Sequence, residues 1–191
     1  EVILYLKKQS YSWELIVIDD GSTDGTLEVF QEYIKKYSNV RLLANSHRGK
    51  GPTVSVGMMS AVGEIRLFTD FDQATPIQEL EKLLPFVEKE YDVMIGSREV
   101  QGAKREHEPS HRHIMGKVFN MFVKFFTIQG IQDTQCGFKL FTKKATEKLF
   151  PKLYIYKPGH VRGDAFTGAF DVELLYIAKK LKGVMKTKTN K

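Results

Sequence analysis

The sequence predicts a single α/β domain in which helices flank a mostly parallel sheet. Along residues 15–95, short continuous apolar runs of the kind that parallel sheets bury on both faces alternate with segments whose apolar side chains keep helical spacing. Polar and acidic turns follow these runs, as at the carboxyl ends of parallel strands where ligands bind. With 191 residues, the chain is long enough for one domain with a sizeable core but short for two.

The first half of the chain is predicted to form four strands separated by helices. Residues 1–10 look like the end of an amphipathic helix, so we expect a strand and a loop upstream of Glu1. The predicted strands are residues 15–18, 40–43, 65–69 and 93–95. The helices between them are marked by Leu27, Phe30, Ile34 and Tyr37, by residues 54–61, and by Leu80, Leu83, Leu84 and Val87.

Turn residues suggest where two of these helices begin. Residues 48–52 are expected to form a flexible basic turn before the helix at residues 54–61. Thr75 is expected to cap the next helix, with Pro76 as its first residue.

The second half of the chain differs from the first in composition and lacks its regular alternation of strands and helices. A polar loop is expected at residues 99–113, and its three histidines lack metal-ligand spacing. A helix follows at residues 114–128, and its wide apolar arc fits a core helix better than one lying at a membrane surface. The remaining predicted elements are a strand at 138–141, a short helix at 142–150, a loop at 154–168, and a last helix that starts near 170 and ends before Gly183.

Charge is distributed unevenly along the chain. The net charge is +6, made up of −5 over residues 1–97 and +11 over residues 98–191. This polarity suggests an acidic, metal-binding half joined to a basic surface that meets phosphates, nucleic acid or an anionic membrane, although a solvated lysine-rich face would give the same count. Cys136 is the only cysteine, which excludes an internal disulfide. No apolar run is long enough to span a bilayer.

Two carboxylates end the predicted strand at residues 65–69. In an extended chain Asp70 and Asp72 would point the same way, so together they could hold a hard divalent cation such as Mg²⁺. For an isolated pair of this kind, a solvated strand end is the better explanation. The neighbouring motifs favour the cation site.

Five segments in order along the chain resemble glycosyltransferase family 2, with its Rossmann-like type-A (GT-A) fold, and within it the dolichyl-phosphate (polyprenyl-phosphate) glucosyl- and mannosyltransferases. They are IVIDDGSTD at residues 16–24, TDFD at 69–72, GSR at 96–98, DTQCGFK at 133–139 and FDVELL at 170–175. The resemblance implies one catalytic domain over residues 1–191, whose initial strand is missing before Glu1. Residues 1–97 would be its nucleotide-binding half and residues 98–191 its acceptor-binding half.

On the donor side, the resemblance implies that Asp20, with Asp19 beside it, contacts the base or ribose of a nucleoside diphosphate sugar. A helix cap is an equally good reading of Asp19. Arg48 and Lys50 would lie near the base and diphosphate, although a solvated turn would explain them equally well.

Of the two strand-end acids, Asp72 would hold Mg²⁺ or Mn²⁺ on the diphosphate, and Asp70 would reach the ribose of the nucleotide sugar or the metal. Asp72 would thereby serve catalysis, because the metal neutralises the leaving group.

On the acceptor side, Arg98 and Arg112 resemble the arginines that grip the lipid phosphate in this branch. Guanidinium groups match phosphate geometry. Because a phosphate oxygen is already anionic, the reaction needs no strong general base. Further candidates, for contacting the sugar or steering the acceptor, are Asp133, Gln135, Asp164 and Asp171, with Asp171 the catalytic candidate and Gln135 the sugar ligand. A structural hydrogen-bonding role explains each of the four at least as well, and Asp171 could simply stabilise the start of a helix.

The expected function is therefore inverting transfer of a hexose, most simply glucose, from UDP-glucose (or GDP-mannose) to a polyprenyl or dolichyl phosphate. We expect peripheral contact with the cytosolic face of a membrane and no nucleic-acid partner. Two alternatives are a family 2 transferase that acts on a saccharide hydroxyl and a nucleotide-binding domain without catalytic activity.

Overall fold

The computed structural model describes residues 1–97, 133–154, 170–181 and 187–189. The first part contains α1 (Val2–Leu6), β1 (Leu15–Asp19), α2 (Thr26–Lys36), β2 (Val40–Ala44), α3 (Lys50–Ser60), β3 (Ile65–Thr69), the 3₁₀ turn η1 (Ile77–Glu79), α4 (Leu80–Glu88) and β4 (Val93–Ile95). The later parts contain β5 (Phe138–Thr142), α6 (Lys143–Leu149), η2 (Phe150–Lys152), α7 (Phe170–Lys180) and β6 (Thr187–Thr189). The predicted α/β class and the strand positions are confirmed.

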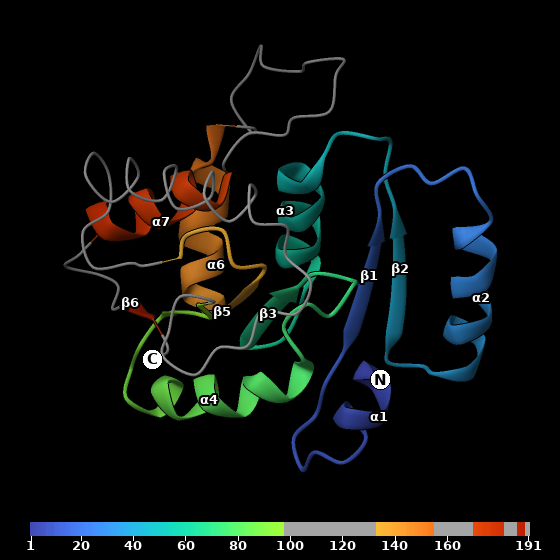
Figure 1. The fold of residues 1–191 in the computed structure, drawn as a ribbon, viewed down its shortest axis with the longest axis horizontal. Helices are drawn as coiled ribbons and strands as arrows, with labels where there is room; N and C mark the ends of the chain where they lie inside the picture. Colours follow the sequence, from blue (N-terminus) through green and yellow to red (C-terminus); the bar gives the residue numbers. More distant parts are fainter. Residues whose placement is uncertain (98–132, 155–169, 182–186, 190–191) are drawn as a thin grey trace, which may run out of the picture.

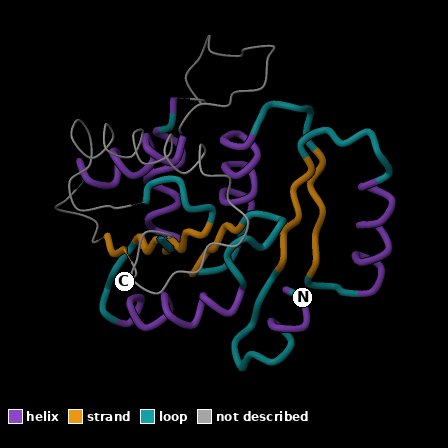
Figure 2. Tube along the Cα trace, viewed as in Figure 1, coloured by secondary structure: helices purple, strands orange, loops and turns teal. Residues whose placement is uncertain are grey.

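The described strands form two sheets (Figures 1 and 2). β1 pairs with β2 in parallel, and the second sheet has the order β3-β5-β4-β6. Within it β5 runs antiparallel to both β3 and β4, so these two strands point the same way without pairing, while β6 is parallel to β4. Among the described strands, β1 pairs only with β2 and β3 only with β5.

Helices cover both faces of the four-stranded sheet: α6 and α7 lie on one side and α4 on the other (Figure 1). Side chains alternate accordingly along β4 and β5. Val93, Ile95 and Phe141 pack with α6 and α7, whereas Met94 and Leu140 pack with α4. This alternation places Lys139, the neighbour of Leu140, on the side of α7.

The smaller sheet is less buried than the sequence suggests. The apolar residues of β1 are only partly buried, although their continuous run predicted burial on both faces. The α2 helix, which lies beside β1 and β2 in Figure 1, has no buried residue. The prediction of burial on both faces was wrong: β1 lies in a two-stranded sheet with one unpaired edge among the described strands, and the neighbouring α2 buries none of its own residues.

The expected cap of α4 was also wrong. Pro76 precedes a 3₁₀ turn in extended conformation, and no side chain caps that turn. The Thr75 hydroxyl instead faces the buried Cys136 sulfur at 3.9 Å.

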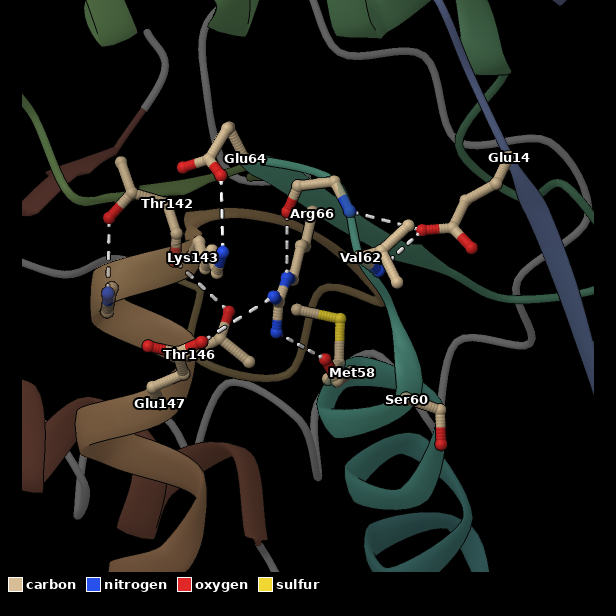
Figure 3. Close-up of polar contacts among 12 residues, drawn as sticks. Glu14, Met58, Ser60, Val62, Glu64, Arg66, Thr142, Lys143, Thr146 and Glu147 are labelled. Atoms are coloured by element: carbon tan, nitrogen blue, oxygen red, sulfur yellow. Dashed lines mark hydrogen bonds and ion pairs between the residues drawn. The ribbon is translucent and has the colours of Figure 1, made fainter.

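The buried side chain of Arg66 holds the C-terminal end of α3 against the sheet (Figure 3). Arg66 of β3 donates from Nη1 to the Met58 carbonyl (2.9 Å) and from Nε to the Gly63 carbonyl (2.9 Å), with its side chain 4% exposed. Glu14 accepts hydrogen bonds from the backbone N–H groups of Val62 and Gly63. Because the last carbonyls of a helix lack intrahelical partners, the Arg66 guanidinium satisfies one of them and complements the helix dipole.

Replacing Arg66 by methionine should lower the free energy of unfolding by about 3 kcal/mol, because two carbonyl groups lose a charged donor in a buried setting. Lys143→Met is the matched control. The pair of Lys143 with Glu64 is 3.3 Å long and exposed, so its loss should cost less than about 1 kcal/mol. Urea unfolding measures both values, and equal effects of the two substitutions would contradict the role assigned to Arg66.

Candidate functional site

Four segments that carry predicted site residues contact one another through a chain of polar contacts. They are the turn after β1, the N-terminal end of α3, the turn after β3 and the turn before β5. Asp20 binds residues at the start of α3, Lys50 of α3 binds Asp70 after β3, and Asp70 binds Gly137 before β5.

Asp19 shapes the turn after β1. Its buried carboxylate accepts hydrogen bonds at 2.9 Å from the backbone N–H groups of Gly21 and Ser22. The Ser22 hydroxyl and backbone bonds outweigh burial and lower the pKa of Asp19. The alternative that Asp19 caps the following helix is wrong, because α2 begins only at Thr26.

Asp20 holds the start of α3. One carboxylate oxygen accepts from the Arg48 N–H (3.0 Å) and the Thr53 hydroxyl (2.8 Å), and the other accepts from the Gly49 N–H (2.9 Å) and lies 3.0 Å from His47 Nδ1. Burial would raise the pKa of Asp20, but these hydrogen bonds and the neighbouring imidazole outweigh it, so the pKa is lowered. Both oxygens are therefore engaged within the protein.

The contacts of Asp20 explain why α3 starts earlier than expected. The helix begins at Lys50, four residues before the predicted start, so residues 50–52 belong to its first turn rather than to a flexible loop. Pro52 is tolerated there because the first N–H groups of a helix have no intrahelical acceptor. Gly49 precedes the helix with φ of 90°, a conformation that favours glycine.

Lys50 and Asp70 form an ion pair. Lys50 Nζ lies 2.7 Å from Asp70 Oδ1, and the two side chains are 46% and 38% exposed. The Asp70 N–H donates to the Gly137 carbonyl at 3.1 Å. A Cβ at Gly137 would lie 1.8 Å from Asp70 Oδ2, so the carboxylate rests directly against this glycine.

Asp72 does not extend the strand as the sequence suggested. β3 ends at Thr69, and Phe71 and Asp72 lie in a turn, so the argument from an extended chain was wrong. The exposed Asp72 carboxylate accepts from the Ala74 N–H at 3.0 Å. Between the two acids, Phe71 is 83% exposed and packs edge-on against Phe30 of α2, with ring centroids 5.8 Å apart.

Asp70 and Asp72 offer the kind of oxygen atoms that would suit a divalent cation. Lys50 already places a positive charge on Asp70, and carboxylate oxygens suit Mg²⁺ or Mn²⁺. In the described part of the chain, no three His, Cys, Asp or Glu side chains gather in a metal-binding group. Two carboxylates at most would come from these residues, which is the usual arrangement where substrate phosphates and water complete the coordination of Mg²⁺.

A second ion pair, which is buried, joins β5 to α7. Lys139 of β5 is fully buried and its ammonium contacts both the Asp171 carboxylate of α7 and the Cys136 carbonyl, each at 2.5 Å. The same ammonium lies 5.1 Å from the centre of the Phe68 ring. Asp171 itself is 7% exposed, so in this structure its carboxylate serves the packing of α7 on the sheet.

Residues 1–150 match the family model described as Glycosyl transferase family 2. The chain belongs to this family. The type-A fold expected from the resemblance is confirmed: the mannosyltransferase PcManGT of Pyrobaculum calidifontis, solved with GDP-Man and Mn²⁺, superposes with a TM-score of 0.52 at 18% identity over 98% of this chain and 49% of that one.

Relatives in sequence carry a more specific name. The dolichyl-phosphate beta-glucosyltransferases of Dictyostelium discoideum and Homo sapiens are 38% and 36% identical over 92% and 95% of this chain. The dolichyl-phosphate beta-glucosyltransferase ALG5C of Trichomonas vaginalis is 36% identical over 94%. The chain spans 53–58% of these three relatives, little more than half their length. The resemblance drawn from the five motifs is thereby confirmed.

The side chains of two other predicted site residues of this family 2 domain are exposed, a third is buried, and the remaining ones lie outside the described residues. Gln135 is exposed, and its N–H donates to the buried Asp133 carboxylate at 3.2 Å. Arg48 contributes its backbone N–H to Asp20, and its side chain is exposed. Outside the described residues lie Arg98, Arg112, Asp164, the histidine loop, the expected helix at 114–128 and Gly183.

Three residues of this site were not singled out from the sequence. Thr53 binds Asp20 from within α3, Gly137 supports Asp70, and Lys139 pairs with Asp171. Only Lys139 carried a signal, because a lysine within the apolar strand at residues 138–141 requires a buried partner.

Asp20→Asn should lower the free energy of unfolding by about 2 kcal/mol at pH 7, because an amide NH₂ would replace an oxygen that accepts from backbone donors. The lowered pKa means that the charged form stabilises the fold above about pH 4, the unfolded-state pKa, and that this stabilisation is lost as pH falls through the folded-state pKa. In urea unfolding, the free energies of unfolding of the original protein and of Asp20→Asn should therefore converge as the pH falls from 7 to 3. Glu32→Gln on the exposed side of α2 is the control, and a constant difference at all pH values would contradict the charge argument.

Removing one partner of the buried pair, by Lys139→Met or Asp171→Leu, should destabilise the fold by about 3–5 kcal/mol, because the other charge is left buried and alone. The double variant Lys139→Met/Asp171→Leu should be more stable than either single variant. Denaturant unfolding of the four proteins gives the coupling between the two sites, and additive effects would show that the pair does not interact in solution.

Proposed function

We propose that this domain transfers glucose, with inversion, from UDP-glucose to dolichyl phosphate or a related polyprenyl phosphate. The observation that carries the proposal is a chain of contacts in a family 2 fold: Asp20 holds the Gly49 N–H before α3, Lys50 of α3 pairs with Asp70, and Asp70 rests against Gly137. The names of the relatives support the acceptor and the sugar. The neighbour solved with GDP-Man supports a nucleoside diphosphate sugar as donor, and GDP-mannose is the alternative to UDP-glucose.

On the donor side, Asp70 and Asp72 would hold Mg²⁺ or Mn²⁺, which would neutralise the departing diphosphate. Lys50 would add a second positive charge to the diphosphate. The carboxylates of Asp19 and Asp20 accept hydrogen bonds from the backbone of the two turns. We therefore propose that these acids position the backbone and the exposed Arg48 side chain to contact the nucleotide. The exposed Gln135 would contact the sugar.

On the acceptor side, Arg98 and Arg112 are proposed to dock the lipid phosphate in line with the sugar carbon. The attacking oxygen is already anionic, so no general base is required of the chain. Asp171 would act through its pair with Lys139, which ties α7 to the turn before Gly137, and a direct contact with the reacting groups stays a prediction.

A lipid acceptor implies contact with a membrane surface, which we propose to be peripheral and on the cytosolic side. No helix among the described residues is long and apolar enough to cross a membrane. The basic balance of residues 98–191 would favour anionic lipids.

Asp72→Ala should abolish the Mn²⁺-dependent part of the stabilisation that UDP-glucose gives to the protein, because a metal ligand is lost. Thermal shift with UDP-glucose and GDP-mannose, each with and without Mn²⁺, measures it, and transfer of radiolabelled sugar to a polyprenyl phosphate measures turnover. Asp24→Ala is the matched control, because Asp24 is also an exposed turn aspartate that accepts a nearby backbone N–H. Unchanged Mn²⁺ dependence in Asp72→Ala would disprove the metal assignment, and transfer only to saccharide hydroxyls would disprove the acceptor.

A further inference from the structure

The ion pair between Lys50 and Asp70 joins two groups that are proposed to bind different parts of the donor. We propose that the Lys50 ammonium acts as a resident counter-ion on Asp70, that a divalent metal displaces it, and that the displaced ammonium then binds the diphosphate. The inference rests on the proposed function. It predicts that Lys50 adds to the cooperativity between metal and nucleotide that a direct metal–diphosphate contact would give.

A metal that binds the Asp70 carboxylate has to compete with the Lys50 ammonium for it. The Asp70 backbone is tied to the Gly137 carbonyl, and both carboxylate oxygens lie within 3 Å of the position that a Gly137 Cβ would take. The carboxylate is thus backed by Gly137 on one side. On Oδ1 it carries the Lys50 ammonium, at 2.7 Å.

Lys50 can leave Asp70 without a change in the fold. Its backbone is fixed at the start of α3 by the bonds of Asp20 to the preceding two N–H groups, but its side chain is a flexible four-carbon stem and is 46% exposed. Exposed ion pairs of this kind contribute little stability, so a divalent cation can replace the ammonium at small cost. A diphosphate with its several negative charges then offers the ammonium a better partner than one shared carboxylate.

The sign of the effect of Lys50 therefore depends on the nucleotide. Without nucleotide, the ammonium occupies Asp70 and repels the metal. With nucleotide, the ammonium is held on the diphosphate and the metal binds an unblocked carboxylate. Because coupling between two ligands is reciprocal, the nucleotide should raise metal affinity by the same factor by which metal raises nucleotide affinity.

The test is a titration of Mn²⁺ followed by the electron paramagnetic resonance signal of the free ion, with and without UDP or GDP. Lys50→Met and Lys50→Gln should bind Mn²⁺ about two- to fivefold more tightly than the original protein when nucleotide is absent, and nucleotide should raise their Mn²⁺ affinity by a smaller factor than it raises that of the original protein. Lys50→Arg keeps the charge and should behave like the original protein. Lys82→Met is the matched control. Lys82 forms an exposed ion pair with Glu79 whose N–O distance is also 2.7 Å, and this pair follows the turn after β3 in the sequence.

Unchanged or weaker nucleotide-free Mn²⁺ binding in both uncharged variants would overturn the inference while leaving the proposed function intact, provided that the original protein binds Mn²⁺ with a nucleotide. If the original protein binds no Mn²⁺ with either nucleotide, the metal assignment of the proposed function fails, and the inference fails with it. A similar gain in Lys82→Met would show a general charge effect and would also overturn the inference.

Discussion

The site depends on one carboxylate, that of Asp20, at the N-terminal end of α3. A helix N-terminus carries unpaired N–H groups and a partial positive charge. The Asp20 carboxylate accepts from the N–H groups of Arg48 and Gly49 and places a negative charge there, and the Thr53 hydroxyl donates to the same carboxylate from within the helix. At the other end, Arg66 and Arg41 donate to the Met58 and Ser60 carbonyls. With charges of opposite sign at its two ends, α3 is fixed in position, and Lys50 in its first turn is thereby placed beside Asp70.

The sequence predicted most of the strands and helices because their signals are local. The apolar run at residues 65–69 and the helical spacing of Leu80 and Leu83 are properties of neighbouring residues, and the structure has the elements there. The start of α3 could not be predicted in this way, because it depends on Asp20, which lies 28 residues before Arg48. The antiparallel insertion of β5 between β3 and β4 likewise depends on contacts between distant segments.

The site was predicted as a set of residues but not as a set of contacts. Asp70 and Lys50 were each assigned to the donor, yet nothing in the sequence indicated that they bind one another across 20 residues. Asp20 was expected to face a ligand, whereas both its oxygens bind the protein. Short polar residues at strand ends serve turns and ligands equally well, so their type and order alone do not separate the two roles.

The buried pair of Lys139 and Asp171 has a consequence for the same site. Burying two charges is costly, and such pairs are weak sources of stability. Lys139 also binds the Cys136 carbonyl, and the next residue is Gly137, which supports the Asp70 carboxylate. The pair therefore fixes the turn before β5 from the side of α7, as Asp20 fixes the start of α3 from the side of β1. Asp70 lies between these two supports, so the position of the proposed metal ligand is set by contacts from both halves of the chain.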